Sequence, residues 1–189
     1  DKALLSQKNT RNQLIKNLGK NTLFLLEHNH TYTLGKNGNP NNILNKNCEL
    51  FETDRGGDVT YHGPGQLVGY PIIDLKTMGL GIRSYVSNIE QVLIHVLYDY
   101  GINASIKPGL TGVWIEDRKI ASIGIRVSRW ITTHGFALNV NTDMNYFSNI
   151  ISCGIENVYM TSMEKELGKK ISMNDIKQST INHFNDIFQ

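Results

Sequence analysis

The hydrophobic pattern of the chain is clearest between Ile82 and Tyr100, where apolar side chains return every three or four residues. This spacing places them on one face of an α-helix. The face consists of Ile82, Tyr85, Val86, Ile89, Val92, Leu93, Val96, Leu97 and Tyr100. A weaker helical pattern runs from Leu5 to Leu18, and Ser172 can cap a last helix that reaches Phe188.

Shorter apolar runs predict strands at Thr22–Leu26 and at Gln66–Leu75, and the polar stretch 36–47 predicts a surface loop. Three runs rich in β-branched residues follow, separated by short polar joins, which is typical of an antiparallel meander. They are Gly112–Glu116, Lys119–Ser128 and Ile131–Asn141. Hairpins with interspersed helices, in place of βαβ units, predict an α+β (mixed α/β) fold with a largely antiparallel sheet.

Composition narrows the class of protein. With 189 residues and 40% hydrophobic content, we expect a single domain over residues 1–189 with a sizeable core. A net charge of +2 is too small to indicate nucleic acid binding, and no apolar run approaches the length of a membrane span. Cys48 and Cys153 form neither a disulfide framework nor a metal-binding spacing, which indicates a reducing compartment. Because the chain begins at Asp1, we expect that a leader or initiator segment has been removed.

The run from Arg55 to Gln66 contains four glycines and a proline, directly before an apolar strand. Glycine lets the backbone adopt positive φ or pass close to a bulky group, while Arg55, Tyr61 and His62 supply charged, phenolic and imidazole side chains. This combination predicts the wall of a binding site. The alternative is an ordinary Gly-Pro hairpin turn.

The same run resembles the Arg-Gly-Gly-x-x-Thr-Tyr-His-Gly-Pro-Gly-Gln motif of the lipoyl(octanoyl) transferases. The resemblance extends over roughly residues 23 to 163, where further segments follow the family order: 27–28, 32–35, 112–114, 118–126, 134–140 and 153–155. Enzymes of this family transfer an octanoyl group from acyl carrier protein to a lysine of lipoate-dependent complexes. The resemblance therefore implies an acyltransferase of lipoate biosynthesis and protein lipoylation, with the biotin/lipoate-protein-ligase-like fold.

The resemblance assigns catalysis to Cys153 and Lys119. Without it, a cysteine between isoleucines is more typical of a core, and a lysine that opens an apolar strand is more typical of a hairpin edge. In the family, the matching cysteine carries the acyl group as a thioester, and the matching lysine lowers the pKa of the thiol and moves the proton. We therefore expect a Cys–Lys dyad. The family commonly has proline before the cysteine, where this chain has Ser152, so a less restricted geometry is expected there.

The resemblance also implies which residues contact the substrate. The Arg55–Gln66 run is the first motif, and its residues Arg55 to His62 would line the acyl and pantetheine channel. Two further segments could supply an oxyanion hole. These residues are Arg55, Gly56, Gly57, Asp58, Val59, Thr60, Tyr61, His62, Ser122, Ile123, Gly124, Gly135, Phe136 and Ala137. Two roles stay open: His62 either binds a substrate carbonyl or orients Lys119, and His134 either braces the site or acts on substrate.

We expect no cofactor and no metal, because His28 and His30 have no third ligand within sequence reach. The implied donor is octanoyl-acyl carrier protein. The implied acceptors are lipoyl domains of 2-oxoacid dehydrogenase complexes or glycine-cleavage H protein, and the chain itself is expected to be a monomer. The expected compartment is the cytoplasm for a bacterial protein, and a plastid of the apicoplast type or a mitochondrion for a eukaryotic one.

Two other functions fit parts of the pattern. An ATP-using lipoate or biotin ligase would share the fold but would form an acyl-adenylate, so acyl transfer without ATP would distinguish the two. A non-catalytic binder of acylated carrier protein or lipoyl domains would keep the channel and lack a nucleophile, whereas this chain has both Cys153 and Lys119.

Overall fold

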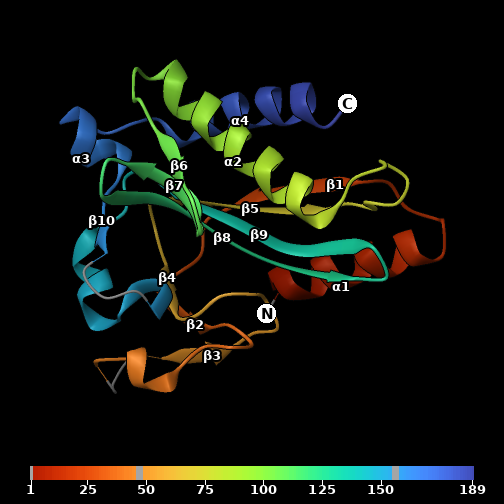
Figure 1. The fold of residues 1–189 in the computed structure, drawn as a ribbon, viewed down its shortest axis with the longest axis horizontal. Helices are drawn as coiled ribbons and strands as arrows, with labels where there is room; N and C mark the ends of the chain where they lie inside the picture. Colours follow the sequence, from red (N-terminus) through yellow and green to blue (C-terminus); the bar gives the residue numbers. More distant parts are fainter. Residues whose placement is uncertain (1, 46–48, 155–157) are drawn as a thin grey trace.

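Two β-sheets and four α-helices make up the described part of the chain (Figure 1). The computed structural model describes residues 2–45, 49–154 and 158–189, without the side chain of Cys153. None of the helices within these residues combines the length and the apolar character that crossing a bilayer requires.

The larger sheet has the strand order β1-β5-β9-β8-β7-β6, with β10 beside β8. The pairs along this order are antiparallel, and β10 pairs with β8 in parallel. The strands are β1 (Thr22–Leu26), β5 (Gln66–Ile72), β6 (Ser105–Lys107), β7 (Leu110–Ile115), β8 (Arg118–Ser128), β9 (Ile131–Asn139) and β10 (Tyr159–Met160). The predicted meander is confirmed as β7–β8–β9.

The strands predicted at Thr22–Leu26 and from Gln66 are confirmed as β1 and β5. β5 ends at Ile72, three residues before the predicted end. The reason is a turn at Asp74, whose carboxylate accepts hydrogen bonds from the backbone N–H groups of Lys76 and Thr77. Such Asx turns compete with continued strand pairing.

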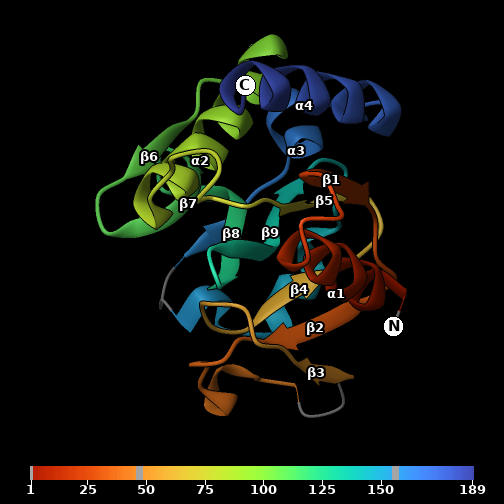
Figure 2. The ribbon, with the colours of Figure 1, turned by 90° about the vertical axis from the view of Figure 1, so that its right-hand side faces the viewer.

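The helices cover both faces of the larger sheet (Figures 1 and 2). α2 (Ile82–Asp99) and α4 (Met173–Ile187) lie on one face and bury their apolar stripes in the main core. The Ser172 hydroxyl accepts a hydrogen bond from Asp175 N, as predicted for this cap. α1 (Lys2–Ile15) lies on the other face against β5 and β9 and ends before the predicted Leu18, because Asn17 adopts a left-handed φ of 56°.

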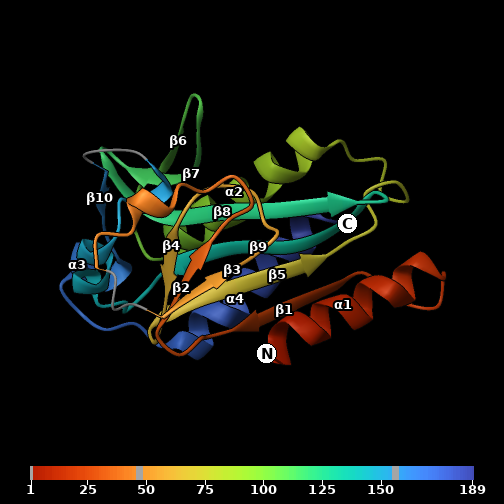
Figure 3. The same ribbon diagram turned by 90° about the horizontal axis from the view of Figure 1, so that it is seen from below.

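A smaller sheet, with the strand order β3-β2-β4, lies on the same side of the larger sheet as α1 (Figures 2 and 3). Its strands are β2 (Thr31–Leu34), β3 (Leu50–Glu52) and β4 (Thr60–His62). The sequence did not predict this sheet, because strands of three or four residues are too short to show alternation. The predicted surface loop 36–47 contains one 3₁₀ turn, η1 (Pro40–Asn42), and residues 46–48 lie outside the described residues.

Three short elements complete the described chain. They are the 3₁₀ helices η2 (Met144–Asn149) and η3 (Ser152–Gly154) and the helix α3 (Met163–Leu167). η3 carries the backbone of Cys153 and contacts β4.

Candidate active site

A cavity of about 230 Å³ lies between the two sheets. β8 and β9 form one wall, and the segment that joins β3 to β4 forms the other. The predicted site residues that line it are Arg55, Gly56, Gly57, Asp58, Val59, Thr60, His62, Lys119, Ser122, Ile123, Gly124, Gly135, Phe136 and Ala137. The fold thus brings three segments that are distant in sequence around one space.

Tyr61 is the predicted binding residue that does not line this cavity. Alternate side chains of a strand point to opposite faces, so Thr60 and His62 face the cavity while Tyr61 points away from it. Its fully buried ring stacks on Tyr146, with ring centroids 4.9 Å apart, and its hydroxyl lies 2.8 Å from His30 Nδ1. Tyr61 therefore belongs to an aromatic cluster behind the cavity wall.

Lys119 is buried, with 3% of its surface exposed, and lines the cavity. A β-bulge explains its direction. Trp114 pairs with Lys119 and Val113 with Ala121, so β8 has one more residue than β7 at this point. The extra residue brings Lys119 to the same side as Ser122, three positions later, where strict alternation would separate them. The ammonium lies 5.3 Å from the centroid of the Trp114 ring, within range of a cation–π contact.

Gly112 makes room for the lysine. It is buried on β7, with a φ of 126° that other residues rarely adopt, and its N–H donates to Glu90 Oε1. A Cβ at this position would lie 2.6 Å from Lys119 Cε. The backbone of Lys119 is held on both sides of β8. Lys119 pairs with Trp114 of β7 on one side, and on the other its carbonyl accepts a hydrogen bond from Thr161 N, directly after β10.

Cys153, the predicted nucleophile, has its backbone in η3, but its side chain lies outside what the structure describes; Cys48 also lies outside the described residues. The position of η3 is given by Gly154, where a Cβ would lie 2.6 Å from Asp58 Oδ2. Because Asp58 lines the cavity, the turn lies at the cavity wall formed by the first motif.

Arg55 fastens that wall to the smaller sheet. Its buried guanidinium donates from Nη2 to the carbonyl and the hydroxyl of Thr33, at 2.7 and 2.8 Å. The next residue, Gly56, donates its N–H to Ile125 O on β8 at 2.9 Å. This close approach needs Gly124, where a Cβ would lie 2.9 Å from Gly56 O.

His62 is held in one tautomer by a chain of hydrogen bonds. The amide nitrogen of Gln66 donates to Tyr61 O and to Asn139 Oδ1, which leaves its oxygen facing His62 Nδ1 at 2.8 Å. An amide oxygen only accepts, so Nδ1 carries the proton and Nε2 is an acceptor. Burial lowers the pKa of His62 to about 3, so the ring is neutral at physiological pH. Nε2 can therefore accept a hydrogen bond from an ammonium such as that of Lys119, but it has no proton to donate to a substrate carbonyl. This favours the orienting role over the binding of a carbonyl.

His134 has partners that favour a bracing role. Its Nε2 lies 2.7 Å from Asp54 Oδ1, and its backbone N–H donates to Gln7 Oε1 of α1 at 2.7 Å. Its φ of 59° is unusual for a residue with a side chain. Burial, with Arg55 and Arg126 nearby, lowers its pKa to about 4.

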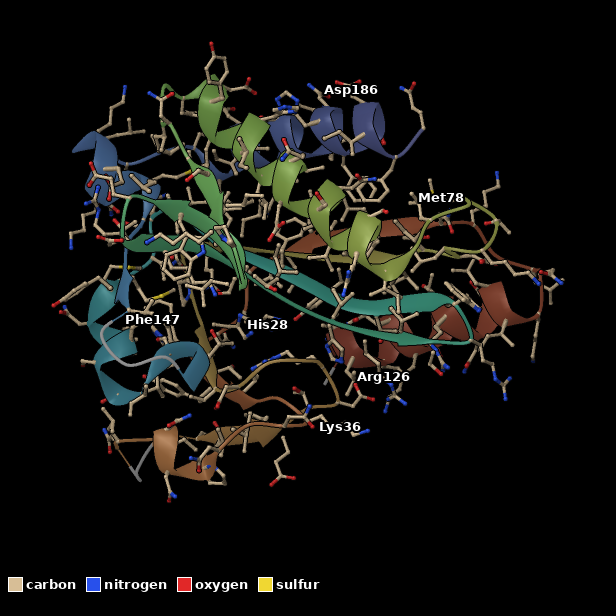
Figure 4. All side chains as sticks on the ribbon, in the orientation of Figure 1. His28, Lys36, Met78, Arg126, Phe147 and Asp186 are labelled. Atoms are coloured by element: carbon tan, nitrogen blue, oxygen red, sulfur yellow. The ribbon has the colours of Figure 1, made fainter. Side chains whose placement is uncertain are left out.

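His28 and His30, the other histidine pair considered from the sequence, bind two different tyrosines. His28 lies between the sheets (Figure 4), with Nε2 2.7 Å from the hydroxyl of Tyr70, whereas His30 binds Tyr61. Within the described residues, no three His, Cys, Asp or Glu side chains are grouped in a way that could hold a metal ion. Tyr70 also lines the cavity, and sequence reasoning missed it.

Comparison with known proteins gives the family. The family model for the lipoyl protein ligase A/B catalytic domain matches residues 2–185. An octanoyltransferase of Christiangramia forsetii is 45% identical over 183 residues, which cover 90% of this chain and 78% of that protein. An octanoyltransferase of Solibacter usitatus is 50% identical over 173 residues, which cover 88% and 78%.

Solved structures support the fold. A bi-partite lipoate protein ligase from Thermoplasma acidophilum superimposes with a TM-score of 0.71 at 16% identity, covering 96% of this chain and 78% of that one. This likeness confirms the predicted lipoate-ligase-like fold. Together with the sequence matches, it leads to one conclusion: the chain belongs to the lipoyl protein ligase A/B catalytic-domain family, among the octanoyltransferases.

Proposed function

We propose that the chain transfers an octanoyl group from octanoyl-acyl carrier protein to a lysine of a lipoyl domain, through a thioester on Cys153. The relatives named octanoyltransferase make it an acyltransferase of protein lipoylation. The observation that carries the finer proposal is the buried Lys119, whose side chain a β-bulge directs into the cavity lined by the first motif.

In the first half-reaction, the thiolate of Cys153 attacks the carbonyl carbon of the donor thioester. A new C–S bond forms, the C–S bond to the carrier breaks, and the carrier thiolate leaves. Lys119 stabilises the thiolate before the attack and gives a proton to the leaving sulfur. A neutral His62 beside the cavity adds no positive charge and offers an acceptor to an ammonium.

In the second half-reaction, the amine of the acceptor lysine attacks the thioester on Cys153. The C–N bond forms, the C–S bond breaks, and the amine loses a proton to Lys119, which has become neutral. The two proton transfers balance, so Lys119 ends each cycle as an ammonium. Residues 122–124 and 135–137 line the cavity where the oxyanion would form, but they lie on strands that are paired within the sheet. The oxyanion hole implied by the family resemblance therefore stays a prediction.

The acceptors we propose are lipoyl domains of 2-oxoacid dehydrogenase complexes or glycine-cleavage H protein, with the chain acting as a monomer. An ATP-using ligase reaction is the alternative outcome of the test. If added ATP were required for transfer, the thioester route would be wrong.

Cys153→Ala tests the nucleophile. Incubation with octanoyl-acyl carrier protein should add one octanoyl group to the parent protein and to Cys48→Ala, and none to Cys153→Ala, as measured by mass spectrometry. Normal turnover by Cys153→Ala would overturn the proposal.

Lys119→Met tests the activating cation. The pH profile of the alkylation rate of Cys153 should shift to higher pH, because the thiolate loses its nearest proposed positive charge. Lys107→Met is the matched control, since Lys107 Nζ lies 5.0 Å from the centroid of the same Trp114 ring but pairs with Asp117. An alkylation profile of Lys119→Met that coincides with that of Lys107→Met would remove Lys119 from this role.

A further inference from the structure

The carboxylate of Asp58 accepts hydrogen bonds from three N–H donors of the chain itself. Val59 N donates to Oδ1 at 2.6 Å, Asn42 Nδ2 donates to Oδ2 at 2.8 Å, and Asn39 N lies 3.2 and 3.3 Å from the two oxygens. Both oxygens of this carboxylate are thus already engaged within the chain, which leaves little acceptor capacity for substrate. Its position between the cavity and η1 suggests a different use.

Asn42 connects this carboxylate to η3. Its side chain binds Asp58, and its backbone carbonyl accepts a hydrogen bond of 2.7 Å from Ile151 N, two residues before Cys153. The neighbouring Ile43 forms a β-bridge with Ile150. The 39–43 segment therefore lies between Asp58 and the residues that lead into the turn.

Gly154, on the other side of Cys153, also contacts the Asp58–Asn42 pair. Its N–H donates to Ile151 O, and its φ is 65°. A Cβ on Gly154 would lie 2.6 Å from Asp58 Oδ2 and 3.1 Å from Asn42 Nδ2, so the glycine backbone packs directly on the Asp58–Asn42 pair. The turn is thus held at Ile151 and Gly154, the positions on either side of Ser152–Cys153.

We propose that Asp58 is a positioning residue that acts through Asn42 to hold the backbone of Cys153 at the cavity wall. The inference rests on the proposed thioester function. In this role Asp58 holds the backbone that carries the nucleophile, whereas the sequence resemblance placed it among the substrate contacts. A carboxylate suits this role because it accepts from several N–H donors at once, whereas an amide has one oxygen and adds a competing NH₂ group.

Single-turnover acylation by octanoyl-acyl carrier protein tests this role. Asp58→Ala should lower the acylation rate constant by about 100-fold, the cost of misplacing a reacting group by roughly 1 Å, while the donor concentration at half-saturation changes little. Asp58→Asn, which keeps one acceptor oxygen, should fall between Asp58→Ala and the parent. Asp143→Ala is the matched control. Asp143 caps η2 by accepting from Asn145 N, and its removal should leave acylation unchanged.

A double-mutant cycle shows whether Asp58 acts through Asn42. Asn42→Ala should slow acylation by a similar factor, and the double variant should be no slower than the slower single variant, because both changes break one connection. Multiplying effects, or an Asp58→Ala variant that acylates at the parental rate, would overturn the inference. A loss confined to donor affinity would instead make Asp58 a substrate contact.

Two outcomes separate this inference from the proposed function. If the parent protein takes no octanoyl group on Cys153, the proposed function fails. If the parent is acylated and the Asp58 variants are acylated equally fast, with thermal stability measured on the same samples, only the positioning role fails.

Discussion

The position of the Lys119 side chain depends on Gly112 of the neighbouring strand β7. Gly112→Ala would place a methyl group 2.6 Å from Lys119 Cε, at a φ of 126°. We expect a loss of about 1–3 kcal/mol in the free energy of unfolding, together with slower octanoyl transfer. Gly101→Ala is the control, because Gly101 has a φ of 74° but an added Cβ there would have no neighbour within 4 Å. Urea unfolding and transfer assays measure both effects, and transfer at the parental rate in Gly112→Ala would contradict the requirement for space.

The neutral histidines around the cavity link folding to pH. Burial lowers the pKa of His62 to about 3, and burial with nearby arginines lowers that of His134 to about 4. Histidine in the unfolded chain titrates at about 6.5, so the unfolded chain binds more protons from about pH 6.5 down to about pH 4 for His134 and about pH 3 for His62. Stability contributed by the two neutral rings is therefore complete above about pH 6.5 and is lost as the pH falls through this window.

Urea unfolding across this window measures the effect. The free energy of unfolding of His62→Gln should fall less than that of the parent between about pH 6.5 and pH 4. The reason is that this variant lacks one of the two histidines whose pKa is lowered by folding. His95→Gln, which removes an exposed imidazole from α2, is the matched control. A decline in His62→Gln as steep as in the parent would show that His62 does not contribute.

Residue types and the order of the motifs predicted most of the residues that line the cavity. They did not predict the direction in which each side chain points. Tyr61 was grouped with its neighbours because β4 was not predicted, and only strand alternation separates it from Thr60 and His62. Tyr70 was missed because it stands in an apolar strand, where an aromatic residue is typical of the core. The direction of Lys119 follows from a bulge, which no periodicity in the sequence reveals.

At the scale of elements, long amphipathic or β-branched segments were predictable and short ones were not. The stripe of α2 and the meander β7–β8–β9 repeat over enough residues to define their period. The smaller sheet depends on pairing between distant segments, since β2 lies between β3 and β4. Its register is set by tertiary contacts that local sequence does not encode.

The packing of the first motif on β8 gives a prediction at this scale. Gly124→Ala would place a Cβ 2.9 Å from Gly56 O and should push the 55–58 segment away from the sheet. Overpacking of this kind typically costs about 1–3 kcal/mol, and we expect a lower kcat/KM for octanoyl-acyl carrier protein. Gly81→Ala, where nothing lies within 4 Å of the added Cβ, is the control. Equal kcat/KM values for the two variants would show that this contact does not shape the site.

At the scale of the whole molecule, the site exists only because two sheets meet. The larger sheet supplies Lys119 and the 122–124 and 135–137 segments, and the chain around the smaller sheet supplies the first motif and the connection to η3. Neither sheet alone encloses the cavity. We therefore expect that variants which loosen the contact between the sheets lose transfer before they lose secondary structure, as circular dichroism and activity measured on the same samples would show.

The most direct measurement isolates the octanoyl-enzyme, free of donor and ATP, and mixes it with a lipoyl domain. We predict that the octanoyl mass leaves the peptide containing Cys153 and appears on one lysine of the domain in a single turnover. An octanoyl group that stays on the enzyme, or that moves only after ATP is added, would contradict the thioester mechanism.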